Sequence, residues 1–271
     1  PQFENWDCPD DWRAVGIDDT LDKSYCVPPP SSACPAGEFI SYSGPGNVVY
    51  VQPGGSFYDY TLDGSLGFSP ATALATIDDA LTLVERYRAF SSLPIDAVLL
   101  AKGEYQGQII LNQDIRLIGA CPEETILRAD FGDFPILWME EAVTNSVENV
   151  TIEGDNAGVV IAGTTSATLA NVVFNGQNLS IHEPSMFSWL PPGTTNVVLD
   201  RVVLRDVSSG YAALYVSGDG TVVTGSDISV TGFIGGISES SAIEIYDAEL
   251  SLERLFLEGG YYGIYHQGSS L

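Results

Sequence analysis

The amino-acid sequence predicts an all-β fold of the solenoid type. Short strand segments repeat at intervals of 22 to 30 residues, each with two apolar residues around a middle position. The stretches between them hold further short apolar strands and are rich in Gly, Ser, Thr, Asn and Asp, which turns require. No helical period of about 3.6 residues links the repeats. Such repeats are typical of a β-solenoid, in which each coil buries its apolar face by stacking on its neighbours.

The repeats align on the residue that precedes each apolar pair. The repeated segments are VENVTIEG, ANVVFNG, DRVVLRD, SDISVTG and ERLFLEG. The aligned residues are Asn149, Asn171, Arg201, Asp227 and Arg254. Further strand candidates are AGVVIAG, AALYVSG, SAIEIYD and YYGIYHQ. We expect each coil to contain one repeat and a second short strand.

One amphipathic helix is predicted near residues 76–90, before the repeats begin. Thr76 suits the N-cap, with Asp79 three positions later. The apolar residues on one face are Ala80, Leu81, Val84 and Tyr87. We expect this helix to cover the first coil, because a solenoid must shield its terminal apolar face. Two tightly spaced coils are expected to follow in residues 95–130.

Four cysteines predict two disulfides. Cys8, Cys26 and Cys34 lie in a Pro-rich opening segment, and Cys121 lies in LIGACPEET. An even count in a loop-rich acidic chain indicates an oxidising compartment, and too few histidines are near for zinc. Of three pairings we favour Cys8–Cys26 and Cys34–Cys121, which would clip the N-terminal module to the first coils. Residues 1–46 are thus expected to form a disulfide-bonded module, and 47–271 the solenoid.

The charge balance excludes several classes of partner. With 36 acidic and 10 basic residues the net charge is −26, which disfavours nucleic acid and anionic lipid. No apolar run of about 18 residues predicts membrane insertion. The charge is compatible with bound calcium, but no EF-hand or β-roll calcium motif occurs. No cofactor is expected, and a metal site stays unknown.

Three segments resemble a known group of proteins: VVYVQPGG, DGSLGFSPATALATIDDAL and VLLAKGEYQGQIILNQDIRLIGA. They look like the opening of secreted bacterial right-handed parallel β-helix proteins of the pectin-lyase-like superfamily. The cysteine segment resembles modules that precede such helices in secreted proteins of myxobacteria and their relatives. The resemblance implies a right-handed parallel β-helix and a secreted or cell-surface location. It implies little about function, because this fold carries lyases, hydrolases, adhesins and spacers.

No catalytic motif is recognised in the coils. The signatures of glycoside hydrolases with this fold, which resemble NTD, GDD, GHG and RxK, do not occur there. Arg201, Arg205, Asp200, Asp206 and Asp227 are residue types that a polysaccharide lyase uses. We interpret them instead as an outward ion-pair ladder. No catalytic residue is assigned, and lyase or hydrolase activity is kept as the alternative.

Two histidines and one aromatic insertion were considered as sites. His266 is expected to be a surface or stacked residue without a partner acid. His182 precedes an insertion that contains Phe187 and Trp189, in the longest interval between repeats. This insertion folds back onto the helix or forms an aromatic platform that stacks on a sugar.

Strand alternation predicts a ligand face. With Val202 and Leu204 inward, Arg201, Val203 and Arg205 should face solvent. On the following coils the same rule turns these residues outward: Asp227, Ser229, Thr231, Arg254, Phe256 and Glu258. Arg201, Asp227 and Arg254 should form a line along stacked rungs about 4.8 Å apart. Val203 and Phe256 would form an apolar stripe beside the charges, which we expect to border a ligand groove.

These observations favour a non-catalytic, structural or adhesive protein that recognises polysaccharide or cell-surface glycan. The final segment, YYGIYHQGSSL, stops inside a coil without a cap. We therefore expect further coils beyond residue 271, or end-on self-association through the open strand edges.

Overall fold

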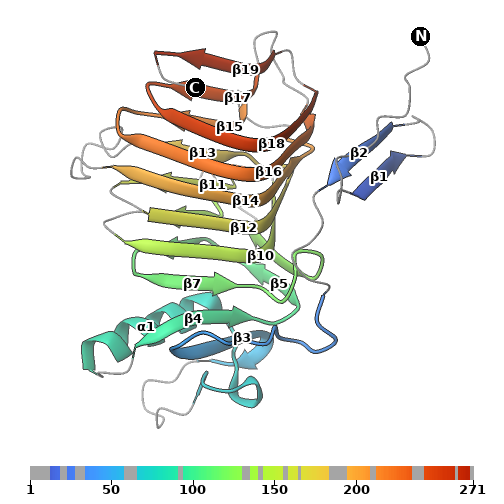
Figure 1. Ribbon diagram of the computed structural model, residues 1–271. Helices are drawn as coiled ribbons and strands as arrows, with labels where there is room; N and C mark the ends of the chain where they lie inside the picture. Colours follow the sequence, from blue (N-terminus) through green and yellow to red (C-terminus); the bar gives the residue numbers. More distant parts are fainter. Residues whose placement is uncertain are drawn as a thin grey trace.

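The computed structural model describes residues 13–18, 23–27, 34–57, 66–90, 94–129, 135–139, 143–154, 158–163, 166–182, 194–207, 212–233, 241–259 and 262–268. Of residues 13–18 and 23–27 it describes the backbone alone. The chain forms a parallel β-solenoid with its coils stacked along one axis (Figure 1). The predicted fold class is confirmed.

Two parallel sheets run along the stack. The ten-stranded sheet contains, in order, β18 (Glu249–Gly259), β16 (Thr221–Phe233), β14 (Thr195–Arg205), β12 (Ser166–Asn175), β10 (Thr144–Gly154), β7 (Ile115–Ile118), β4 (Ile95–Leu100) and β3 (Asn47–Ser56), joined by β8 (Thr125–Ala129) and β5 (Gly103–Gln106). The seven-stranded sheet contains β19 (Tyr262–Gln267), β17 (Ser241–Tyr246), β15 (Ala212–Ser217), β13 (Leu179–His182), β11 (Val159–Ala162), β9 (Leu137–Met139) and β6 (Ile109–Leu111).

Each long strand of the ten-stranded sheet from β10 to β18 bends at one non-glycine residue with positive φ. These residues are Asn149 (57°), Asn171 (55°), Arg201 (52°), Asp227 (60°) and Arg254 (53°), the five on which the repeats align. Asn and Asp tolerate this left-handed conformation better than most residues, and arginine does so less readily. The aligned residues are therefore the corners of the solenoid.

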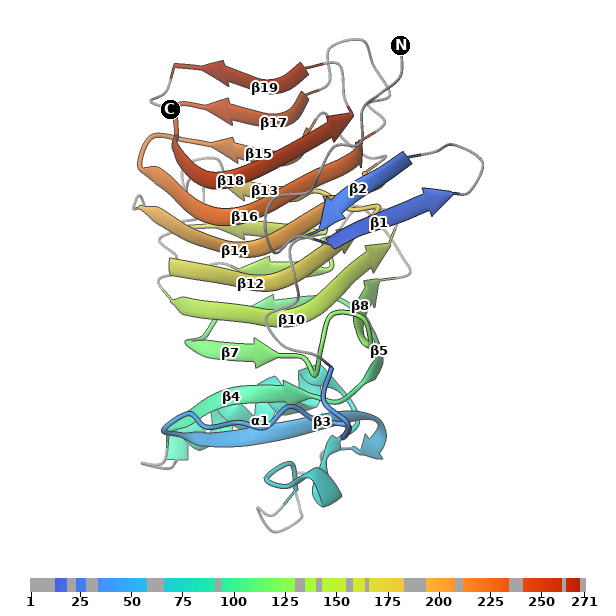
Figure 2. The ribbon, with the colours of Figure 1, turned by 45° about the vertical axis from the view of Figure 1, so that its right-hand side comes forward.

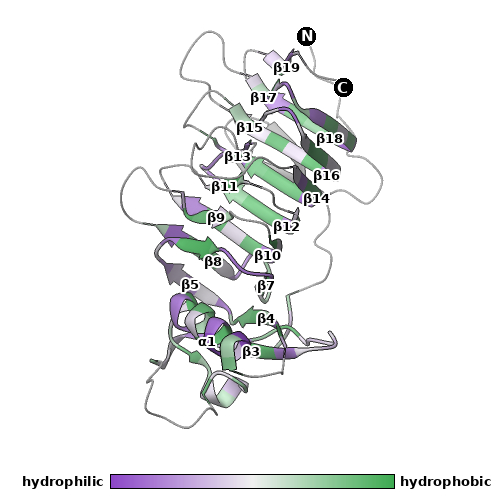
Figure 3. Ribbon diagram, turned by 90° about the vertical axis from the view of Figure 1, so that its left-hand side faces the viewer, coloured by the Kyte–Doolittle hydropathy of each residue, from purple (hydrophilic) through white to green (hydrophobic). Residues whose placement is uncertain are grey.

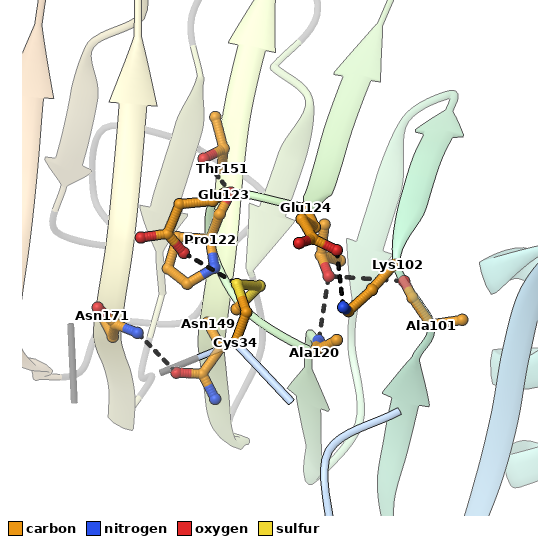
Figure 4. The surroundings of a disulfide bond; sticks show 12 residues. Cys34, Ala101, Lys102, Ala120, Pro122, Glu123, Glu124, Asn149, Thr151 and Asn171 are labelled. Atoms are coloured by element: carbon orange, nitrogen blue, oxygen red, sulfur yellow. Dashed lines mark hydrogen bonds and ion pairs between the residues drawn. A yellow bond between two sulfur atoms is a disulfide. The ribbon is translucent and has the colours of Figure 1, made fainter. Parts of the chain in front are cut away.

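The corner divides each long strand into two arms. The first arm of β10 pairs with β7, and its second arm pairs with β8. A hydrogen bond of 2.8 Å from Asn171 Nδ2 to Asn149 Oδ1 joins two successive corners (Figure 4). The left-handed residue interrupts the alternation of inward and outward side chains along the strand. The alternation therefore begins again after the corner, in a new phase. In β10 they are Val147 before it, and Val150 and Ile152 after it.

The core is a set of inward columns that continue from coil to coil. Ile152, Phe174 and Leu204 pair in register on β10, β12 and β14, and none is exposed to solvent. Apolar strands follow one another along the stack in Figure 3. Since each coil packs mainly on its neighbours, stability comes from these coil-to-coil contacts.

The predicted helix caps the first coil. α1 spans Ile77–Phe90 and lies at the end of the stack beside β3 and β4 (Figure 1). The Asp79 amide donates to Thr76 Oγ1 at 3.0 Å, which confirms the predicted N-cap. Ala80, Leu81 and Val84 are buried as expected. The short 3₁₀ helix η1 (Pro70–Thr72) precedes α1.

One disulfide fastens the segment before β3 to the second coil. Cys34 and Cys121 are bonded, which confirms the favoured pairing across 87 positions of sequence (Figure 4). Lys102 Nζ forms an ion pair of 2.8 Å with Glu124 beside it. Cys8 lies outside the described residues, so its pairing with Cys26 stays a prediction.

An antiparallel hairpin precedes that segment. It consists of β1 (Arg13–Asp18) and β2 (Lys23–Val27). The hairpin lies beside the solenoid in Figures 1 and 2, and β2 contacts β16. This contact places the hairpin against the outer side of the ten-stranded sheet.

The longest interval between repeats contains a strand that the sequence patterns did not reveal. β13 (Leu179–His182) pairs with β11 on one side and β15 on the other. It is only four residues long and directly precedes the aromatic insertion, so its apolar pattern was not recognised as a rung.

The two sheets end at β18 and β19 within the described residues. Ile264 of β19 is 42% exposed, whereas its neighbour in the same inward column, Ile243, is fully buried. His266 continues the adjacent inward column, since it pairs with the buried Ile245. His266 therefore stacks on the inward side of the last described coil, which agrees with the expected stacked position.

Candidate functional site

The predicted line of corner charges exists. Residues on either side of Arg201, Asp227 and Arg254 pair in register, so the three corners follow one another along the stack. Arg254 donates to both carboxylate oxygens of Asp227, at 2.5 and 2.6 Å, which raises the pKa of the guanidinium. Arg201 forms an ion pair of 2.5 Å with Asp200 of its own strand, because both side chains point outward at the corner.

The prediction that this outward face is exposed to solvent is wrong for three of its residues. Val203 is 5% exposed, Ser229 is fully buried and Thr231 is 1% exposed, although all three were expected to face solvent. Strand alternation does point them away from the core, but the hairpin strand β2 contacts β16 on this side. Phe256 is half-buried, as is Glu258. This face is therefore partly covered and offers no continuous exposed stripe.

A longer polar ladder runs along the second arms and was not foreseen. Arg128 forms ion pairs of 2.9 Å with Glu104 and with Glu153. Asn175 donates to Glu153 at 3.2 Å and accepts from Arg205 Nε at 3.2 Å. Arg205, predicted as part of the ligand face, thus belongs to a hydrogen-bonded ladder. The rest of this ladder lies on the rungs before Arg205, where alternation was not applied.

The strongest candidate for a binding site is the outer face of the seven-stranded sheet. Four aromatic rings stack there on β13, β15, β17 and β19. The ring centroids of successive pairs are 5.3 Å (His182–Tyr215), 5.6 Å (Tyr215–Tyr246) and 5.6 Å (Tyr246–Tyr265) apart. We call these four residues the aromatic row.

The rings of the aromatic row are tilted against one another by 35° to 47°. Because the rings follow one another along the solenoid axis, their faces contact neighbouring rings. Their edges therefore remain for contact with a ligand. Tyr265, at the end of the row, is 41% exposed, and its hydroxyl donates to Gln267 Oε1 at 3.3 Å.

A carboxyl group lies within the row. Glu244 of β17 pairs in register with Tyr215 and Tyr265, and it is only 6% exposed. Burial raises the pKa of Glu244, and hydrogen bonds from the Tyr246 hydroxyl and the Ser241 amide counteract this in part. Burial likewise raises the pKa of Tyr246, helped by the nearby Glu244 carboxylate.

His182 is the other titratable group of the row. Its Nδ1 lies 3.1 Å from Ser217 Oγ on the neighbouring strand. Burial lowers the pKa of His182 from 6.5 to about 4. The shifts of His182, Glu244 and Tyr246 all favour the uncharged form of the side chain. His182 and Tyr246 are therefore uncharged at neutral pH, on a protein whose net charge is −26.

The pKa of His182 gives a pH-dependent stability. The unfolded chain takes up a proton near pH 6.5, whereas the folded protein does so only near pH 4. Stability from His182 is thus fully present above about pH 6.5 and is lost as the pH falls toward 4. We expect the stability difference between wild type and His182→Gln to change across this window and to be constant above it, in urea unfolding series. Tyr215→Phe keeps the imidazole and serves as the control; a difference for His182→Gln that does not vary with pH would contradict the assignment.

Two other predicted sites remain without structural evidence. Phe187 and Trp189 lie outside the described residues, so the aromatic platform stays a prediction. Among the described residues, the group with the spacing of metal ligands is Cys34, Cys121 and Glu124. Its two sulfurs form a disulfide and offer no thiolate. The metal site therefore stays unknown, and only the acidic composition favours calcium.

Comparison with known proteins adds no assignment. No protein-family model matches the chain, and no curated protein matches it. The described part of the chain contains no helix long and apolar enough to cross a membrane. The functional argument therefore rests on the geometry of the aromatic row and on the charges around it.

Proposed function

We propose that this protein is a non-catalytic glycan-binding protein, secreted or displayed at the cell surface, with a structural or adhesive role. The aromatic row carries the proposal. It presents similar side chains on four successive strands of one sheet, and such a repeating surface suits a repeating polymer. Tyrosine combines an apolar ring with a hydroxyl group, which suits the apolar and hydroxyl-bearing surfaces of a sugar.

The titration behaviour of the row favours an uncharged glycan. His182, Glu244 and Tyr246 each have a pKa shift that favours the neutral side chain. Elsewhere the protein is strongly acidic, so a polyuronate would meet long-range repulsion. A neutral polysaccharide meets none and can exchange hydrogen bonds with the phenol hydroxyl groups.

Polysaccharide cleavage is the second candidate. The raised pKa of Glu244 is a property that a general acid needs. A lyase or hydrolase also needs a base or nucleophile. The lowered pKa of His182 makes it a weaker base, and the raised pKa of Tyr246 disfavours the phenolate form that would act as one. Assignment to the pectin-lyase-like superfamily is part of this second proposal.

The disulfide supports the proposed location. Cys34–Cys121 requires an oxidising environment to form and persist, which supports secretion or surface display. The strands β18 and β19 lie at the edges of their sheets, which is compatible with a second copy of the chain as neighbour.

Affinity electrophoresis in gels that contain neutral or acidic polysaccharides tests the glycan proposal. We expect retardation by a neutral polysaccharide and none by polygalacturonate. Removing two hydroxyl groups in Tyr215→Phe/Tyr246→Phe should weaken binding about thirtyfold, since each of the two hydrogen bonds contributes about 1 kcal/mol. Tyr50→Phe, whose ring packs on Phe39 in another part of the fold, is the control. Equal retardation by polygalacturonate, or unchanged binding of the double variant, would contradict the proposal.

A further inference from the structure

A second concave site lies at the opposite end of the seven-stranded sheet from β19. It is a cavity of about 530 Å³ between α1 and the β5–β6 segment. Small-molecule sites commonly measure about 300–1,000 Å³. We call it the α1 groove; one wall carries Asp78, Leu81 and Glu85, and the other carries Gln106, Gln108 and Ile110.

The helix wall of the α1 groove is formed by a single face of α1. Asp78 and Glu85 are seven positions apart, two helical turns, so they lie above one another with Leu81 between them. The Thr76 cap fixes the start of the helix and with it the position of Asp78. Both carboxylates are thus held on a rigid element at the edge of the cavity.

The opposite wall supplies amides and apolar surface. Gln108 donates its amide to the Pro135 carbonyl at 3.3 Å, which fixes its direction. Ile110 is 44% exposed although it lies on a strand, so it offers an apolar patch inside the groove. The Tyr105 hydroxyl donates to the Ala101 carbonyl at 2.9 Å and is engaged within the fold.

The charge of the groove indicates what it would accept. Its lining includes the acids Asp78, Glu85 and Glu104 and no Lys or Arg. Glu104 is neutralised by Arg128 at 2.9 Å. The side chains of Asp78 and Glu85 form no ion pair within the described part of the chain. The two carboxylates attract a cation. The amides of the opposite wall suit hydroxyl groups on that cation, and the apolar side chains suit its methylene groups.

We propose that the α1 groove binds an alkylammonium ligand, with its ammonium groups paired with Asp78 and with Glu85, which lie about 10 Å apart along the helix. Amino sugars and polyamines share this chemistry. The amides of Gln106 and Gln108 would contact hydroxyl groups, and Leu81 and Ile110 would contact the carbon skeleton. This site does not depend on the aromatic row, and separate variants test the two.

Titration calorimetry with three probes tests the proposal: glucosamine disaccharide, its N-acetylated form and putrescine. We expect the amine probes to bind and the N-acetylated sugar to bind much more weakly. Binding of the glucosamine disaccharide identifies amino sugars as ligands, and binding of putrescine alone identifies polyamines. The affinity should also fall with added salt, because the carboxylates lie at an open rim.

Substitutions locate the binding site. Asp78→Asn and Glu85→Gln should each weaken amine binding about threefold, and together about tenfold. Asp79→Asn is the matched control, since Asp79 lies in the same helical turn but outside the groove. Equal binding of the N-acetylated sugar, an equal loss in Asp79→Asn, or no binding of either amine would overturn the proposal.

Discussion

Replacing Phe174 by alanine is expected to destabilise the folded protein by about 3–5 kcal/mol. Phe174 is among the largest fully buried side chains and lies between Ile152 and Leu204 in one inward column. Its removal leaves a cavity between adjacent coils, and coils depend on their immediate neighbours for burial. Urea unfolding followed by circular dichroism measures the loss.

The control for this substitution is Phe57→Ala. Phe57 is 76% exposed, so the same chemical change should alter the free energy of unfolding by no more than about 0.5 kcal/mol. A loss below about 1 kcal/mol for Phe174→Ala would show that the coils do not stack in the register described.

Removing the disulfide should have an effect of similar size. The bond closes a loop of 87 positions, for which chain entropy gives a stabilisation of about 4 kcal/mol. We expect Cys34→Ala/Cys121→Ala to lose this amount in urea unfolding, with the segment before β3 becoming sensitive to protease. Wild-type protein treated with a reductant should behave in the same way.

A peptide map under non-reducing conditions tests both predicted disulfides. It should contain the Cys34 and Cys121 peptides linked, and the Cys8 and Cys26 peptides linked. A Cys8–Cys34 link, or free thiols at Cys34 and Cys121, would contradict the disulfide between the N-terminal module and the solenoid.

The fold could be predicted from the sequence because the stacking of coils requires apolar residues at the same positions of each repeat. Apolar pairs such as Val150 and Ile152 recur wherever a second arm must face the core. The N-cap at Thr76 and the Cys34–Cys121 bond were also predictable, since both depend on local spacing or on a small number of pairings.

The alternation of side chains within a single strand could not predict how far the expected ligand face is exposed to solvent. Alternation gives the direction of Val203 and Ser229 correctly but cannot reveal that both are buried, nor that β2 contacts β16, the strand of Ser229. The corner conformation of Arg201 was equally hidden, because arginine does not favour positive φ as glycine or asparagine does.

The aromatic row escaped prediction for a different reason. Its rings occupy two different outward positions: His182 and Tyr246 pair with Ser217, whereas Tyr215 and Tyr265 pair with Glu244. No single column of the repeat contains all four residues. A sequence alignment of coils that included β13 and allowed neighbouring outward positions would have brought them together.

The most direct test of the central claim is to measure binding and cleavage on the same panel of polysaccharides. A glycan-binding protein without catalytic function should be retained by a neutral polysaccharide and release no reducing ends and no unsaturated sugars detectable by ultraviolet absorbance. Steady turnover of any polysaccharide, abolished by Glu244→Gln, would contradict the account and establish the enzymatic alternative.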